Sequence, residues 1–145
     1  DALPIYDIFM DGLFQYGDEI FFPMFQFDEI SCSKNQLEDT LRVMIQKCIE
    51  EHKVSKIAHE EITAMIHSDS LVASYYYKRE LLLTEKIQKI FLKQHFEEDG
   101  LLEKIHIMIG LMDQVCHEVI YHQHPNMNYE KMIDIVISSI LNLFQ

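Results

Sequence analysis

Apolar side chains recur along most of this chain with the 3.6-residue period of an α-helix. The clearest run begins at Leu37, where Leu41, Met44, Ile45 and Cys48 follow on the same helical face. Further helices are predicted from about Ser55 to His67, Leu71 to Gln94, Leu101 to His122, and Asn126 or Asn128 to Phe144. The pattern therefore predicts an all-α fold, a single bundle of about six helices.

Residues 1–30 differ from the remainder in composition. They hold seven acidic residues, no Lys or Arg, and eight of the sixteen Phe and Tyr residues. A helix is predicted from about Ile5 to Tyr16, followed by a break at Gly17 and a shorter piece interrupted by Pro23. Segments resembling β-strands fit this acidic aromatic stretch equally well. We expect one domain over residues 1–145, with an atypical part at 1–30 and the core at 33–145.

Polar residues mark where several helices begin and end. Ser33 and Gln36 have the spacing of a capping box before the run that starts at Leu37. Residues 68–70, Ser-Asp-Ser, provide caps for the long helix from Leu71. Gly100 is expected to terminate that helix, since glycine adopts the left-handed conformation that ends many helices.

The last two predicted helices carry more apolar surface than one buried stripe requires. Such a surplus indicates either a central position in the core or an oligomer interface. Because little sequence follows the final helix, we favour the oligomer interface. The residues predicted at that interface are Ile105, Ile109, Cys116, Ile120, Met132, Val136, Ile140 and Phe144.

Net charge and cysteine content indicate which partners and which cellular compartment suit this chain. Twelve basic and 24 acidic residues give a net charge of −12, which disfavours direct binding of nucleic acid. Cys32, Cys48 and Cys116 lie far apart, which suits a reducing compartment rather than a disulfide scaffold. The acidic start does not match a signal peptide, and no apolar run reaches membrane-spanning length. We expect a cytoplasmic protein that does not enter a membrane.

Known catalytic and metal motifs are missing from the sequence. It contains no glycine-rich phosphate loop, no Gly-x-Ser-x-Gly elbow and no His-Glu-x-x-His. His117 and His122 are five residues apart, which points their rings about 140° from each other on a helix, against the i, i+3 or i+4 spacing of a ligand pair. Cys116 and His117 are adjacent and therefore point apart. We predict no enzymatic activity, no metal and no cofactor.

A polar stripe interrupts the helix predicted from Leu101 to His122. His106, Gly110, Asp113 and His117 share one side, which faces either solvent or an internal cavity. Inward periodicity elsewhere predicts a mostly apolar pocket for a small molecule, with His106 or Asp113 and Tyr75 as polar anchors. The predicted lining residues are Met44, Met65, Tyr75, Tyr76, Leu82, Phe91, His106, Met108, Met112 and Asp113.

The pattern over about residues 36–144 resembles that of TetR/AcrR-type transcriptional regulators. From Gln114 to Phe144 a long helix ends, a short break follows, and a last helix opens with Tyr129-Glu-Lys-Met-Ile. From Leu41 to Gln94 a helix, a short helix, an Asp/Ser junction and a long helix beginning with tyrosines follow in the same order. The likeness rests on helix lengths and patterning rather than on an invariant motif.

The resemblance implies a homodimer that senses a small apolar or amphipathic effector in an internal pocket of its C-terminal domain. It also implies that the last two helices of each copy form a four-helix dimer interface and that an N-terminal helix-turn-helix binds DNA. No helix-turn-helix is recognisable in this chain, and residues 1–30 do not resemble the usual first helix of such domains. We therefore expect either that DNA is bound through a part that this chain does not contain, or that this is a relative of the family that has lost DNA binding. The alternative is a stand-alone helical protein–protein interaction module without a ligand.

Overall fold

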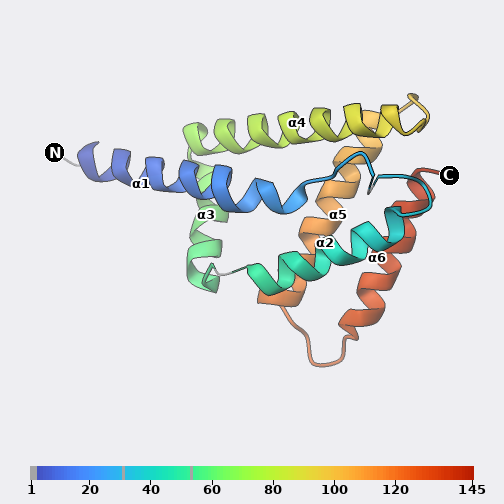
Figure 1. The fold of residues 1–145 in the computed structure, drawn as a ribbon. Helices are drawn as coiled ribbons and strands as arrows, with labels where there is room; N and C mark the ends of the chain where they lie inside the picture. Colours follow the sequence, from blue (N-terminus) through green and yellow to red (C-terminus); the bar gives the residue numbers. More distant parts are fainter. Residues whose placement is uncertain (1–2, 31, 53) are drawn as a thin grey trace. The chain divides into compact units, whose positions relative to one another are not determined.

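A computed structural model describes residues 3–30, 32–52 and 54–145 (Figure 1). The described residues form six α-helices and no β-strand, which confirms the all-α prediction. In chain order they are α1 (Leu3–Tyr16), α2 (Leu37–Glu51), α3 (Lys56–Ser68), α4 (Ser70–Lys93), α5 (Leu101–Tyr121) and α6 (Tyr129–Leu143), with η1 (Gly17–Phe21) and η2 (Phe22–Phe25) after α1. Within these ranges, no helix combines the length and the apolarity needed to cross a bilayer.

Contacts within the chain divide it into two compact units. Unit 1 comprises Asp1–Gln26 and Val54–Leu83, and unit 2 comprises Phe27–Lys53 and Thr84–Gln145. Unit 1 therefore contains α1, α3 and the first part of α4, whereas unit 2 contains α2, the end of α4, α5 and α6. The expectation of a single domain stays a prediction.

Unit 1 is built around a small apolar cluster contributed by α1 and α4. Met10, Leu13 and Val72 are buried at its centre, and the half-buried side chains Phe14, Ile62, Met65, Ile66 and Tyr76 pack against them. At the start of α4, the Asp69 carboxylate accepts hydrogen bonds from the backbone N–H groups of Leu71 and Val72. This confirms the cap predicted at the Asp/Ser junction.

The chain does not break at Gly17 as predicted; it continues through η1 as a π-helical turn. The Tyr75 hydroxyl lies 2.8 Å from the Phe14 carbonyl oxygen and 3.0 Å from Asp18 Oδ1, both of which are acceptors. A side chain that inserts into a helix's hydrogen-bond ladder widens it locally. A Cβ atom at Gly17 would lie only 2.5 Å from the Tyr75 oxygen, so any larger residue there would force the Tyr75 side chain to move.

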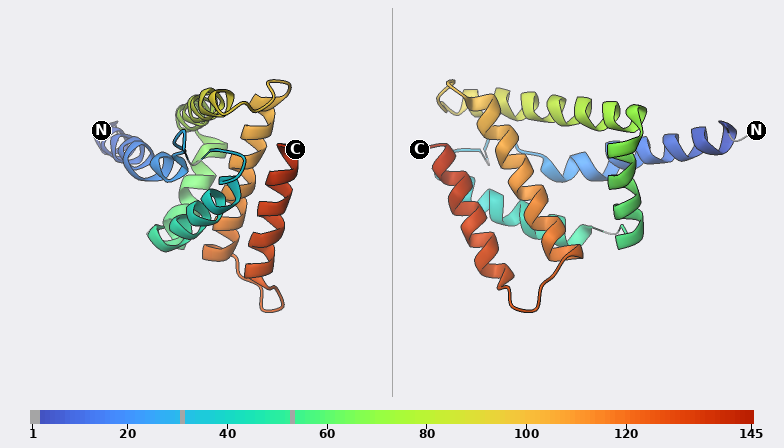
Figure 2. Two further views of the ribbon diagram at one scale, coloured as in Figure 1. Left: turned by 45° about the vertical axis from the view of Figure 1, so that its right-hand side comes forward. Right: turned by 180° about the vertical axis from the view of Figure 1, so that it is seen from behind.

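Unit 2 is centred on α5, which packs against α2 and α6. Figures 1 and 2 show α5 and α6 side by side and antiparallel, with α2 crossing them. The predicted inward face of α2 is buried at Leu37, Leu41, Met44, Ile45 and Cys48. The buried side chains of α5 are Leu101, Ile105, Met108, Ile109, Met112, Val115, Cys116 and Tyr121. The broad apolar face of α5 is thus explained by a central position in the core.

The end of α4 corrects the role predicted for Gly100. His95 takes the left-handed conformation (φ 61°), and the N–H groups of His95 and Phe96 donate to the carbonyls of Leu92 and Phe91. This is a Schellman motif, completed by ring packing between Phe91 and Phe96 at a centroid distance of 4.5 Å. Gly100, with φ 65°, instead occupies the N-cap of α5.

Two side-chain caps begin helices where the sequence predicts them, and one predicted cap does not form. Ser55 accepts from the N–H of Ala58 at the start of α3, and Asn128 accepts from the N–H of Lys131 at the start of α6. Ser33 lies too early for a capping box, because α2 begins at Leu37 with Gln36 as its N-cap. The Ser33 hydroxyl donates to the Gln36 side chain instead.

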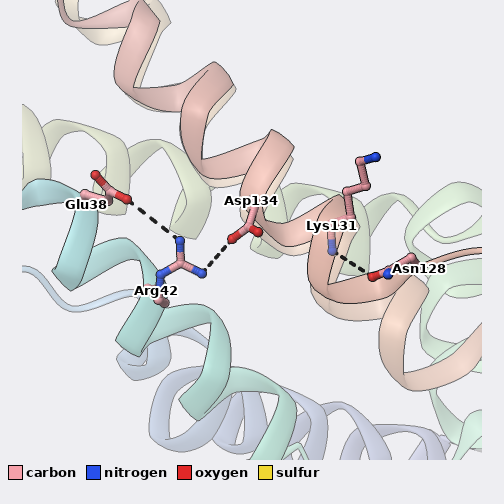
Figure 3. A network of polar contacts seen from close by, with 5 residues as sticks. All are labelled: Glu38, Arg42, Asn128, Lys131 and Asp134. Atoms are coloured by element: carbon pink, nitrogen blue, oxygen red, sulfur yellow. Dashed lines mark hydrogen bonds and ion pairs between the residues drawn. The ribbon is translucent and has the colours of Figure 1, made fainter.

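An exposed ion-pair network links α2 with α6 close to the Asn128 cap of α6 (Figure 3). The Arg42 guanidinium lies 2.8 Å from Asp134 on α6 and 3.8 Å from Glu38 one turn earlier on α2. Exposed pairs of this kind contribute little to stability, up to about 1 kcal/mol each. The network therefore assists α2–α6 packing, while buried apolar contacts supply most of its energy.

Replacing Asn128 with Ala removes the acceptor that caps α6. We expect the free energy of unfolding to fall by about 1 kcal/mol, because an N–H in the first turn loses its partner. Asn126→Ala is the matched control, since this exposed asparagine lies two residues before the cap. Urea denaturation of both variants, followed by circular dichroism, measures the difference. Equal destabilisation of the two variants would contradict the assignment.

Candidate functional site

The residues predicted to line a pocket fall in both units and at different depths. Met44, Phe91, Met108 and Met112 are buried in unit 2. Met65, Tyr75 and Tyr76 of unit 1 and Asp113 of unit 2 are half-buried. Leu82, 46% exposed, and the exposed His106 lie at the surface, so their assignment to an internal lining is corrected.

Tyr75 was also predicted to anchor a ligand, but its hydroxyl group already has partners within the chain. Its hydroxyl is already placed between the Phe14 carbonyl and the Asp18 carboxylate within unit 1. Burial, with the nearby Asp18 carboxylate, raises the pKa of Tyr75, and burial raises that of Tyr76 to about 12. Both phenols therefore stay protonated at neutral pH. Tyr75 serves to join α1 to α4.

The side chains predicted at a dimer interface separate into two groups. Ile105, Ile109, Cys116 and Ile140 are at most 5% exposed in the single chain, so their burial assigns them to its own core. Ile120, Met132, Val136 and Phe144 are half-buried. Of these, Phe144 packs its ring against Phe91 and Phe96.

Unit 2 also holds a group of ionisable side chains, which we call the thiol–imidazole cluster. Its members are Cys48 and His52 from α2 and its C-cap, and Asp113, Cys116, His117 and Tyr121 from α5. The His52 ring lies 5.6 Å from that of His117 and 5.5 Å from that of Tyr121, measured between centroids. Both nitrogens of His52 are shielded from solvent and lack a partner at full hydrogen-bond geometry.

Two thiols meet within this cluster. Cys116 Sγ lies 3.9 Å from the Ile45 carbonyl oxygen of α2, one turn before Cys48. A hydrogen bond from Cys116, together with the adjacent His52, lowers the pKa of Cys48 from 9.0 to about 6 although burial opposes ionisation. The same hydrogen bond and burial raise the pKa of Cys116. Cys48 is therefore the thiol that ionises first, and Cys116 stays protonated and stabilises it.

The polar stripe of α5 changes character along its length. His106 and Gly110 are exposed, whereas Asp113 and His117 are half-buried and form a pair 3.3 Å apart. Burial lowers the pKa of His117, but the hydrogen bond and charge of Asp113 outweigh it, so the net shift is upward. The stripe thus runs from solvent into the thiol–imidazole cluster.

A reactive thiolate beside imidazoles can perform nucleophilic or redox chemistry. The sequence alone does not reveal the thiol–imidazole cluster, because Cys48 and Cys116 are 68 positions apart and each has the spacing of an ordinary core residue. The available signal was that both lie on the buried rows of their helices.

The Asp113–His117 pair should make stability depend on pH. Because the folded-state pKa of His117 is raised above 6.5, its contribution is complete below pH 6.5 and is lost as the pH rises through the folded value. Asp113→Asn should remove this slope, at a cost of up to about 1 kcal/mol at pH 6. Glu118→Gln is the matched control, since its partner His124 is exposed. Urea denaturation between pH 5.5 and about 8.5 tests it, and an unchanged slope in the Asp113 variant would refute it.

Comparison with known proteins gives no similarity that would assign a family or a function to the fold or the site. A scan against protein-family models finds no match, and searches of curated proteins and of solved structures find no match either.

Proposed function

We propose that this chain is the effector-sensing and dimerisation domain of a TetR-type transcriptional regulator. The observation that carries the proposal is the surplus apolar surface of α6. Eight of its fifteen side chains are aliphatic or methionine, yet only Ile137 and Ile140 are buried in the single chain. Of the other six, Ile135 is exposed and five are half-buried, so α6 keeps apolar surface uncovered in the single chain, which is typical of interaction sites.

The neighbouring helix α5 supports the same conclusion. Ile107 on α5 is 49% exposed and Ile135 on α6 is 58% exposed, although both helices contribute to the core through their other faces. Gly110 follows Ile107 by one turn and is exposed, and a Cβ atom added to it would meet open space, with no neighbouring atom within 4 Å. A glycine there lets a second helix approach the α5 backbone closely, which offsets its low helix propensity.

Two copies of α5 and α6 related by a twofold axis would form a four-helix interface. Such an interface is isologous, so each copy presents the same apolar surface to the other. The half-buried residues Ile120, Met132 and Val136 would complete the contact. The dimer proposed here therefore uses the outer faces of α5 and α6, while Ile105, Ile109, Cys116 and Ile140 stay in the core of each copy.

The sensing part of the proposal concerns a small apolar or amphipathic molecule. Three of the predicted lining residues, Met44, Met108 and Met112, are buried in unit 2 on α2 and α5. Methionine is flexible and polarisable, so a lining rich in it adapts to apolar ligands of different shapes. The dimer helix α5 carries two of these residues, which provides a physical route from ligand to dimer geometry.

DNA binding is assigned to a helix-turn-helix that this chain does not contain. The net charge of −12 opposes contact with phosphates, which supports a division of labour between sensing and DNA binding. An effector would act by binding one arrangement of the dimer more tightly than another.

Ile135→Glu tests the dimer surface without disturbing the core. The side chain is largely exposed in the single chain, so a charge there is hydrated in the monomer but buried and unpaired in the dimer. We expect the parent chain to be a dimer and the variant a monomer of unchanged helicity, measured by light scattering and circular dichroism. Ile57→Glu, at an exposed isoleucine of α3, is the matched control and should stay dimeric. A monomeric parent chain would contradict the proposal and favour an interaction module for other proteins.

Methyl NMR of the methionines tests the ligand pocket. A small molecule that raises the thermal midpoint should shift the signals of Met44, Met108 and Met112, because these buried side chains are predicted to line the pocket. Met127 is 45% exposed in the loop before α6 and serves as the internal control. Shifts confined to Met127, or a core that binds no compound from an apolar and amphipathic library, would contradict the sensing role.

A further inference from the structure

Two buried thiols on different helices of unit 2 are close enough to interact. One turn before Cys48, the Ile45 carbonyl oxygen lies 3.9 Å from Cys116 Sγ, and one turn after Cys48 the His52 ring lies 5.6 Å from that of His117, so Cys48 faces the part of α5 that carries Cys116. The helices α2 and α5 that carry them pack against each other. A disulfide requires Cα atoms about 4.4–6.8 Å apart, so cysteines on two different helices can form one only where the helices pack closely.

We propose that Cys48 and Cys116 form a site of reversible thiol oxidation, at which a hydroperoxide converts the pair into an intramolecular disulfide linking α2 to α5. In reducing compartments a disulfide of this kind is transient and serves redox sensing rather than structure. The inference does not depend on the dimer or on the effector pocket.

The chemistry balances with one molecule of hydroperoxide for each pair of thiols. The Cys48 thiolate attacks a peroxide oxygen, the O–O bond breaks, and Cys48 becomes a sulfenic acid while hydroxide or alkoxide leaves. The Cys116 sulfur then attacks the Cys48 sulfur, the S–O bond breaks, and the departing hydroxide takes the Cys116 proton to form water. The two sulfurs are oxidised and the peroxide is reduced to water, or to water and an alcohol.

His52 is the group placed to accept the Cys48 proton and return it to the first leaving group. It lies four residues after Cys48, one turn along α2, and neither of its ring nitrogens has another partner at full hydrogen-bond geometry. The other ionisable groups around the sulfur are Cys116, Asp113, His117 and Tyr121 of α5. The Asp113 carboxylate opposes ionisation of Cys48, whereas His52 favours it.

Trypsin cleavage distinguishes the three cysteines, because each lies in a separate peptide. Cys32 falls in residues 1–34, Cys48 in 48–53 and Cys116 in 105–131. After treatment of the reduced full chain with hydrogen peroxide, we expect the intact mass to fall by two hydrogen atoms. Mass spectrometry should find peptide 48–53 joined to 105–131, and dithiothreitol should restore both.

Cysteine variants provide the controls. Cys32→Ser, at another buried cysteine, should form the same linked peptide, whereas Cys48→Ser and Cys116→Ser should not. The mapping of the unaltered chain needs no variant, so the result stands even if a serine variant fails to fold. A disulfide to Cys32, disulfides only between copies, overoxidation without a linked peptide, or two unreactive thiols would overturn the proposal.

The pH dependence of alkylation tests the part assigned to His52. The Cys48 thiol should reach half its maximal rate with iodoacetamide near pH 6, and His52→Gln should move this midpoint upward and slow disulfide formation. Circular dichroism confirms that the variant is folded, and a purely structural role for His52 would leave the midpoint in place. An unchanged midpoint and rate would overturn the assignment of the proton to His52.

Discussion

Unit 2 depends on the burial of α5 between α2 and α6. Eight of its side chains are buried, in two adjacent rows that make contact with both neighbours. Each buried aliphatic or methionine side chain contributes roughly 1.5–3 kcal/mol relative to exposure, so this helix supplies a large share of the apolar stabilisation of unit 2. The caps at Gly100 and Asn128 and the Schellman turn at His95 then determine where helices start and stop.

The central position of α5 also places its ionisable side chains together in its C-terminal half. The first half of its polar stripe faces solvent, whereas Asp113 and His117 reach inward beside Cys116. The small side chain of Cys116 allows the α2 backbone to approach, and this contact brings Cys48 and His52 into the same cluster. Close helix packing and a reactive thiol pair therefore have the same physical cause.

The same helix connects the cluster with the surface proposed for dimerisation. Its buried rows belong to the core and include Cys116, while Ile107 and Gly110 are exposed on α5 as Ile135 is on α6. A change in the packing of α5, by ligand or by a disulfide to α2, would therefore alter the outer face as well. Effector binding and thiol oxidation would then both act by changing the packing of α5.

Local sequence determined the helices of this protein. Period, caps and breakers predicted six helices with ends close to those observed, because these signals act between residues a few positions apart. Two local signals failed for different reasons. At Gly17 a long-range contact from Tyr75 accompanies a π-turn where a break was expected, whereas at the end of α4 a second local signal, the Schellman turn with Phe91–Phe96 packing, ends the helix at His95 before Gly100. Tertiary packing alone decided which apolar rows are core and which stay exposed, as Ile140 and Ile135 show. It also brought Cys48 to Cys116, since the sequence contains no local trace of a contact between residues 68 positions apart.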